Sequence, residues 1–137
     1  MFHLFLVTPE KIIYDDLIHS IIVPGTIGYF EVLTNHAAII SSLTIGKLII
    51  TDKNNVKSLW SISGGLFEFT KNKATLLGDA VELSSAIDIK RAESEIIHSK
   101  KVIEEATHNP VELQSAKREL KVAMNRLKIV QEGRKSA

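Results

Sequence analysis

Cysteine is absent from the 137 residues, which excludes disulfide bonds and any cysteine-based metal or nucleophile site. Long apolar runs are also missing. The apolar run 2–7 is soon followed by Pro9-Glu10 and has no basic lead, unlike a signal peptide. No run approaches the roughly twenty apolar residues that a membrane-spanning helix needs. We therefore expect a soluble protein without a transmembrane segment.

Motifs for metal or phosphate binding are not found. The histidines lack the H-x-H and H-E-x-x-H spacings that place two ligands on one element. Gly46-Lys47 is followed by Leu48 and has no upstream glycine at P-loop spacing, so it predicts no phosphate-binding loop. Gly64-Gly65 lies between two strand-like runs and indicates a bulge or a close backbone approach. We predict no catalytic residue and no metal ligand.

Aromatic residues make up only 6% of the sequence and lie mainly in its first part, whereas the basic excess lies in the last part. Residues 1–83 contain six lysines and eight acids, and residues 84–137 contain eleven basic residues and eight acids. Proteins that bind single-stranded nucleic acid interleave basic and aromatic side chains. That pattern is missing, so we expect no nucleic-acid partner.

Residues 1–83 contain short runs of β-branched and aromatic residues separated by turn-forming residues. Leu17, His19, Ile21 and Val23 alternate as a half-buried strand does. Short, evenly spaced strands are typical of a β-sandwich or barrel. The predicted strands are 3–8, 11–14, 17–23, 29–33, 47–51, 56–63, 66–70 and 74–78.

Residues 84–132 change to a helical period, with one apolar stripe in each of two segments. Ser85 followed by Asp88 predicts the start of the first helix. Asn109-Pro110 followed by Glu112 predicts the start of the second. The break at 107–110 is short, so the two helices should form a hairpin. The predicted domains are therefore 1–83 and 84–137. The stripe residues are Ile89, Ala92, Ile96, Ile103 and Ala106, then Leu113, Ala116, Leu120, Ala123, Leu127 and Val130.

Charged residues on the arm allow two interpretations. Asp88 and Arg91 are three residues apart on one helix face, where they form a first-turn ion pair or help to hold a polar ligand such as a nucleotide. Lys117, Lys121 and Lys128 share one side of the second helix, with Arg118 beside them. This side is either a solvated face or a surface for an acidic partner.

The sequence closely resembles the epsilon subunit of F-type ATP synthase along essentially its whole length. No single motif is decisive, but the order and spacing of the motifs together are specific. The matching segments are Val7-Thr8-Pro9-Glu10, Ile22-Val23-Pro24-Gly25, Val32-Leu33-Thr34-Asn35-His36-Ala37, Ser61-Ile62-Ser63-Gly64-Gly65, Ala74-Thr75-Leu76-Leu77-Gly78-Asp79-Ala80 and Ile87-Asp88-Ile89-Lys90-Arg91-Ala92.

The resemblance implies a ten-stranded β-sandwich followed by an antiparallel helical hairpin. It implies a non-catalytic rotor subunit of the central stalk, which couples proton flow to ATP synthesis and restrains ATP hydrolysis through its C-terminal arm. The implied partners are the gamma subunit and the c-ring for the sandwich, and the beta subunit for the extended arm. The implied location is peripheral, on the cytoplasmic face of the bacterial inner membrane.

In the sandwich, the resemblance implies a gamma and c-ring interface at Tyr29, Phe30, Glu31 and His36. His36 matches the family's histidine in the loop that faces gamma. Tyr29-Phe30-Glu31 replaces the commoner Glu-Leu-Gly, and Thr34 replaces a proline. We therefore expect apolar or stacking contacts there instead of charge pairs.

In the arm, the resemblance implies regulatory ATP as the only cofactor. His98 and Val122 replace arginines of ATP-binding members, so we expect weak binding. The resemblance also implies that the basic side of the second helix meets an acidic segment of beta through Lys117, Arg118, Lys121 and Lys128. The implied ATP-site residues are Glu82, Ile87, Asp88, Arg91, Ala92 and Arg126.

Two other functions fit parts of the sequence. A free-standing nucleotide sensor would use the Asp88 and Arg91 segment as its binding core, and calorimetry on the isolated chain would reveal tight binding. A generic β-sandwich adaptor would use its arm in a coiled coil, and ultracentrifugation would reveal a stable homodimer. Without the resemblance, the residues alone support only the adaptor.

Overall fold

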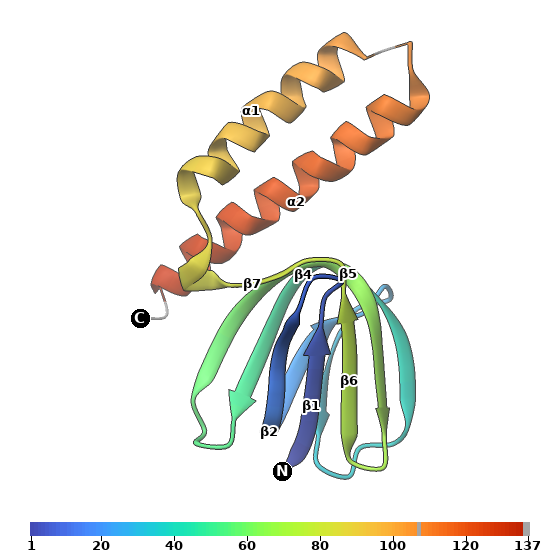
Figure 1. The fold of residues 1–137 in the computed structure, drawn as a ribbon, viewed down its shortest axis with the longest axis vertical. Helices are drawn as coiled ribbons and strands as arrows, with labels where there is room; N and C mark the ends of the chain where they lie inside the picture. Colours follow the sequence, from blue (N-terminus) through green and yellow to red (C-terminus); the bar gives the residue numbers. More distant parts are fainter. Residues whose placement is uncertain (107, 136–137) are drawn as a thin grey trace. The chain divides into compact units, whose positions relative to one another are not determined.

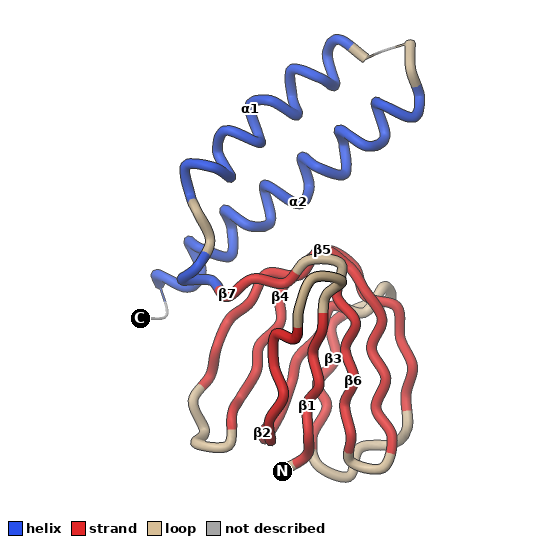
Figure 2. The backbone as a smooth tube through the Cα atoms, viewed as in Figure 1, coloured by secondary structure: helices blue, strands red, loops and turns tan. Residues whose placement is uncertain are grey.

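The structure is a computed structural model that describes residues 1–106 and 108–135 (Figure 1). The chain divides into two compact units, Met1–Leu83 and Ser84–Ala137. The first unit is built of strands and the second of helices (Figure 2). The expected class, a β-sandwich domain followed by an antiparallel two-helix hairpin, is confirmed.

One sheet of seven strands forms the first unit, in the order β1-β6-β5-β4-β2-β3, and β7 pairs with β5. β1 is parallel to β6 and also pairs antiparallel with β2, so the sheet closes around an interior. Closure removes most of the free edges at which strands of other chains could add. The strands are β1 (Phe2–Val7), β2 (Ile12–Pro24), β3 (Tyr29–Leu33), β4 (Ile39–Asp52), β5 (Lys57–Thr70), β6 (Lys73–Gly78) and β7 (Val81–Leu83).

Alternate residues of the strands fill this interior. In β1, Phe2, Leu4 and Leu6 are buried and the residues between them are half-buried. The rings of Phe2 and Phe69 meet edge to face with centroids 5.2 Å apart, an arrangement that the ring quadrupole favours. Each large apolar side chain buried in this way contributes about 1.5–3 kcal/mol. The first unit therefore has its own hydrophobic core.

Three strands are longer than the sequence predicts. β2 joins the runs 11–14 and 17–23, β4 begins at Ile39 instead of Lys47, and β5 joins 56–63 with 66–70. The structure therefore has seven continuous strands where the resemblance implies ten. In β5, Gly65 has a φ of 153°, and a Cβ there would collide with the carbonyl oxygen of Leu77. Pairing with β4 and β6 continues through Gly65, which confirms the predicted close backbone approach.

The second unit begins with a short 3-10 turn, η1 (Ser84–Ala86), and continues into α1 (Ile89–Glu105) and α2 (Pro110–Lys135). Asp88 caps α1, so the start predicted at Ser85 is wrong by about one turn. The start of α2 is as predicted, because Asn109 Oδ1 accepts a hydrogen bond of 3.2 Å from the backbone N–H of Glu112. The predicted break at 107–110 includes Thr107, which lies outside the described residues.

Small side chains fill several buried positions of the helical hairpin. Ala92 and Ser99 of α1 and Ala106, its C-cap residue, are buried at seven-residue intervals, and Ala116 and Ala123 are buried on α2. We call these five residues the small-residue seam. The seven-residue repeat is that of a coiled-coil contact, but alanine and serine bury far less apolar area than leucine would. The seam therefore buries little apolar area, and the larger buried side chains of α2, Ile129 and Val130, lie beyond it near the C-terminal end of the helix.

Candidate functional site

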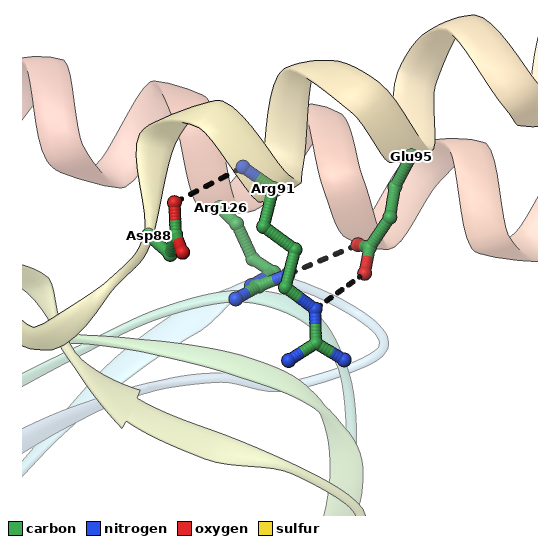
Figure 3. Close-up of polar contacts among 4 residues, drawn as sticks. All are labelled: Asp88, Arg91, Glu95 and Arg126. Atoms are coloured by element: carbon green, nitrogen blue, oxygen red, sulfur yellow. Dashed lines mark hydrogen bonds and ion pairs between the residues drawn. The ribbon is translucent and has the colours of Figure 1, made fainter.

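A cluster of charged side chains joins the two helices of the hairpin (Figure 3). Glu95 on α1 uses both carboxylate oxygens: Oε1 lies 3.1 Å from Arg91 Nε, and Oε2 lies 3.0 Å from Arg126 Nη1 on α2. The side chain of Arg126 is 11% exposed, whereas that of Arg91 is 71% exposed. Because water and salt screen exposed charges most, the pair of Glu95 with Arg126 is the stronger one.

The segment 87–92 builds the start of α1. Asp88 Oδ1 accepts a hydrogen bond of 3.0 Å from the backbone N–H of Arg91, which satisfies a free donor of the first turn. Ile87 and Ala92 are both buried and occupy the two positions that a hydrophobic staple joins. The predicted Asp88–Arg91 ion pair is wrong, because Asp88 caps the helix and the Arg91 guanidinium pairs with Glu95.

The six residues implied for ATP come from both units of the chain. Ile87, Asp88, Arg91 and Ala92 lie at the start of α1, and Arg126 reaches the same cluster from α2 through Glu95. Glu82 lies in β7 of the first unit, opposite Ser61 of β5. The helix-start roles of Ile87, Asp88 and Ala92 account for these residues without any ligand.

A hollow of about 460 Å³ lies between α1 and α2, next to this cluster. Its lining includes His98 and Val122, the positions at which the resemblance implies arginines. The charged groups that line it are the carboxylates of Glu95 and Glu119 and the guanidinium of Arg118. This balance of charge disfavours a polyphosphate, because an anion is repelled by nearby carboxylates.

The three lysines of α2 named above are exposed, and their spacing aligns them along one side of the helix. We call Lys117, Lys121 and Lys128 the lysine stripe. Met124, 52% exposed, lies on the same side. Arg118 does not belong to this stripe, since it lines the hollow between the helices. Arg118 is itself exposed beside Lys117.

In the first unit, β3 carries three of the residues implied for the rotor interface. Tyr29 and Glu31 are exposed, whereas Phe30 lies between them and packs edge to face on Phe67, with ring centroids 5.9 Å apart. Phe30 thus contributes to the core. The hydroxyl of Tyr29 accepts a hydrogen bond of 3.1 Å from the backbone N–H of Lys47, which holds the exposed ring in place.

His36 lies in the loop between β3 and β4 and is half-buried. Its ring meets Phe69 edge to face with centroids 5.9 Å apart, and Nδ1 donates a hydrogen bond of 2.7 Å to the carbonyl oxygen of Ala37. Asn35 and Asn72 fasten this loop to the β5–β6 turn through two hydrogen bonds of 2.7 and 2.8 Å. The loop therefore presents His36 in a defined position.

Both units of the chain match models of known protein domains. The model of the ATP synthase delta/epsilon chain β-sandwich domain matches residues 1–84, and the model of its long α-helix domain matches residues 85–131. The chain belongs to the ATP synthase delta/epsilon family. Curated relatives agree. The ATP synthase epsilon chain of Protochlamydia amoebophila is 38% identical over 76% of this chain and 71% of the relative. That of Ligilactobacillus salivarius is 32% identical over 90% of this chain and 91% of the relative.

Solved structures share the fold of this delta/epsilon family member. A chain of the mitochondrial ATP synthase of Euglena gracilis aligns with a TM-score of 0.76 and 15% identity, over 89% of this chain and 76% of that chain. A chain in the structure of the central stalk and c-ring of the Tetrahymena thermophila mitochondrial ATP synthase aligns with a TM-score of 0.55 and 15% identity, over 96% of this chain and 94% of that chain. Family membership makes the chain a non-catalytic rotor subunit of ATP synthase.

Exposed apolar side chains of this delta/epsilon chain were not singled out from the sequence. Ile40, Leu66 and Leu77 are 70%, 43% and 47% exposed. We call these three residues the outer apolar patch: Leu66 pairs with Leu77, and Ile40 pairs with Glu68, two residues along from Leu66 on the same face. Contiguous exposed apolar residues mark interaction surfaces. Strand alternation could have revealed them, because each lies at an outward position.

Among the described residues, neither helix combines the length and the apolar content that a membrane span requires. The described residues also contain no group of three or more metal-binding side chains.

Proposed function

We propose that the β domain of this rotor subunit holds it on gamma and the c-ring, and that the helical arm restrains ATP hydrolysis by extending to the beta subunit. The observation that carries this proposal is the division of the chain into a closed sheet with its own core and a hairpin joined by small residues. Such a hairpin can open while the β domain stays folded.

Support for the rotor contacts comes from the exposed side chains of the first unit. Tyr29 and Glu31 project from β3, which pairs with β2 alone, and Leu33 is 52% exposed on the same strand. Exposed aromatic and aliphatic groups next to one acid suit a mixed, partly apolar interface. We assign β3 and the His36 loop to gamma and the c-ring, with the outer apolar patch as further contact area.

The seam explains why the arm could act as a switch. Burying an alanine side chain contributes about one methylene's worth of stabilisation, roughly 0.8 kcal/mol, against about 1.5–3 kcal/mol for leucine or isoleucine. Two-state switching from mostly closed to mostly extended needs about 5.5 kcal/mol of differential binding. The lysine stripe could supply part of this on entering an acidic, partly desolvated site on beta.

ATP enters the proposal only as a weak ligand of the arm. Arg91 and Arg126 would hold its phosphates, but both already bind Glu95. Positions 98 and 122 carry histidine and valine instead of arginine. Losing two charge-assisted contacts of roughly 1.5–3 kcal/mol each lowers affinity by about two to four orders of magnitude. Millimolar binding is therefore expected.

The proposed location is the cytoplasmic face of the bacterial inner membrane, as a peripheral part of the complex. Attachment would be indirect, through gamma and the c-ring.

Truncation tests the proposal. A chain that ends at Leu83 should still join the synthase and restore coupled ATP synthesis, while ATP hydrolysis rises relative to the full chain. Loss of assembly by the truncated chain would assign binding to the arm and overturn the division of roles. Equal hydrolysis with and without the arm would remove its inhibitory function. A stable homodimer in ultracentrifugation would favour the adaptor, and micromolar ATP binding by the isolated chain would favour the sensor.

A further inference from the structure

Two guanidinium groups from different helices converge on one carboxylate in the hairpin. Glu95 receives Arg91 Nε at 3.1 Å and Arg126 Nη1 at 3.0 Å, one on each oxygen (Figure 3). Planar guanidinium groups bind carboxylates and phosphates with the same donor geometry. The carboxylate of Glu95 therefore occupies a place that suits an external anion.

Glu95 lies between Ala92 and Ser99, two residues of the small-residue seam, and this position gives the contact a second consequence. Small, similar side chains recur every seven residues along the seam, so shape alone discriminates weakly between the correct pairing and a shift along the helix. A partly buried ion pair between helices is favourable in only one register. Arg126, at 11% exposure, lies on α2 where it can meet Glu95 only when the hairpin is closed in register.

We propose that Glu95 is a built-in anion, which closes the hairpin by filling the site between Arg91 and Arg126 and so keeps phosphate groups out of it. The inference rests on the proposed function only in treating the hairpin as the regulatory arm. Its consequence is an arm whose closed state does not depend on a nucleotide. Neutralising Glu95 would make closure depend on an added anion.

The test uses the full chain, in which nitroxide labels at Lys90→Cys and Gln131→Cys report opening of the hairpin. Both positions are exposed, and no other cysteine competes for the label. Glu95→Gln should raise the ratio of open to closed hairpin about tenfold, equivalent to about 1.4 kcal/mol. Glu93→Gln is the matched control, since Glu93 is an exposed acid of the same helix, and it should leave the ratio unchanged.

Inorganic triphosphate supplies a readout that loss of packing alone would not change. It should close the Glu95→Gln hairpin again at millimolar concentration and leave the distance distribution of the unsubstituted chain unchanged. Binding of triphosphate to Glu95→Gln should be at least tenfold tighter than to the Glu93→Gln control.

Three results would overturn the inference. Glu95→Gln could behave as Glu93→Gln does, which would remove the closing role. Triphosphate could fail to close the Glu95→Gln hairpin, or could bind both chains equally, and either would show that Glu95 does not fill an anion site. All measurements use the isolated chain, so these failures leave inhibition of the synthase untouched, whereas failure of the truncation experiment leaves the Glu95 result standing.

Discussion

Ala123 offers a direct test of the weak seam. Its side chain is fully buried on α2, and it is one of the five residues of the small-residue seam. Leucine at this position adds three carbon atoms to a close-packed contact. Overpacking of this kind costs typically 1–3 kcal/mol, because neighbouring side chains or the backbone must shift. The same free energy changes the ratio of open to closed hairpin by about 5–150-fold.

The direction of the functional effect follows from the proposed mechanism. The extended arm is the inhibitory form, so Ala123→Leu should open the hairpin and lower ATP hydrolysis by the reconstituted synthase. Labels at Lys90→Cys and Gln131→Cys measure the opening in the isolated chain. Met124→Leu is the control, because Met124 is 52% exposed and leucine has a similar volume to methionine. It should leave the label distance unchanged.

Two outcomes separate the two parts of this reasoning. If Ala123→Leu and Met124→Leu give the same label distances as the unsubstituted chain, the seam tolerates leucine and the packing argument is refuted. If Ala123→Leu opens the hairpin while hydrolysis stays unchanged, the packing argument holds and the inhibitory role of the extended arm does not.

Three further predictions follow. Reversing the lysine stripe to glutamate should leave assembly intact and raise hydrolysis, and inhibition by the normal chain should weaken as salt increases, because salt screens charge attraction; unchanged rates would make the stripe a solvated face. Arginine at both His98 and Val122 should tighten ATP binding at least tenfold in calorimetry, and no change would argue against an ATP site there. Burial, then the charges of Asp52 and Asp16, raise the pKa of Tyr14 above its ordinary value of 10.0. The folded state therefore favours the neutral phenol. The contribution of Tyr14 to the free energy of unfolding is present below pH 10 and is lost as pH rises through the higher folded pKa. Urea unfolding between pH 8 and 11 should therefore show a smaller loss of stability for Tyr14→Phe than for the unsubstituted chain.

Periodicity was sufficient to predict the two halves of the chain and many residues of the helical contact. The change from a period of two to a period near 3.6 falls at residue 84, where the second unit begins. The predicted stripe missed Ile129, which is 2% exposed, and Ser99, which is 1% exposed in the middle of the seam. A serine scores as polar in any pattern, but its small size suits a position where two helix backbones come close.

The start of α1 was harder to predict, because two residues satisfy the rule for a capping residue. Ser85 and Asp88 are both good capping residues three positions apart. Asp88 caps the helix in the structure, and Ile87 before it is buried. Burial of the residue before the cap depends on tertiary packing, which sequence spacing does not contain. For the same reason β5 could be read as two strands, since a glycine pair marks a bend and a turn equally well.

The sequence alone does not show which acid Arg91 pairs with in the candidate site. Arg91 is three residues from Asp88 and four from Glu95, and both spacings place an acid on the same helix face. The choice between them depends on two contacts outside that face. Asp88 is engaged by the backbone N–H of Arg91, and Glu95 is drawn to Arg126, 31 residues away on the other helix. A helix end and a second helix thus decide which acid an arginine binds, so the closed hairpin itself determines how much positive charge the arm has left to offer an anion.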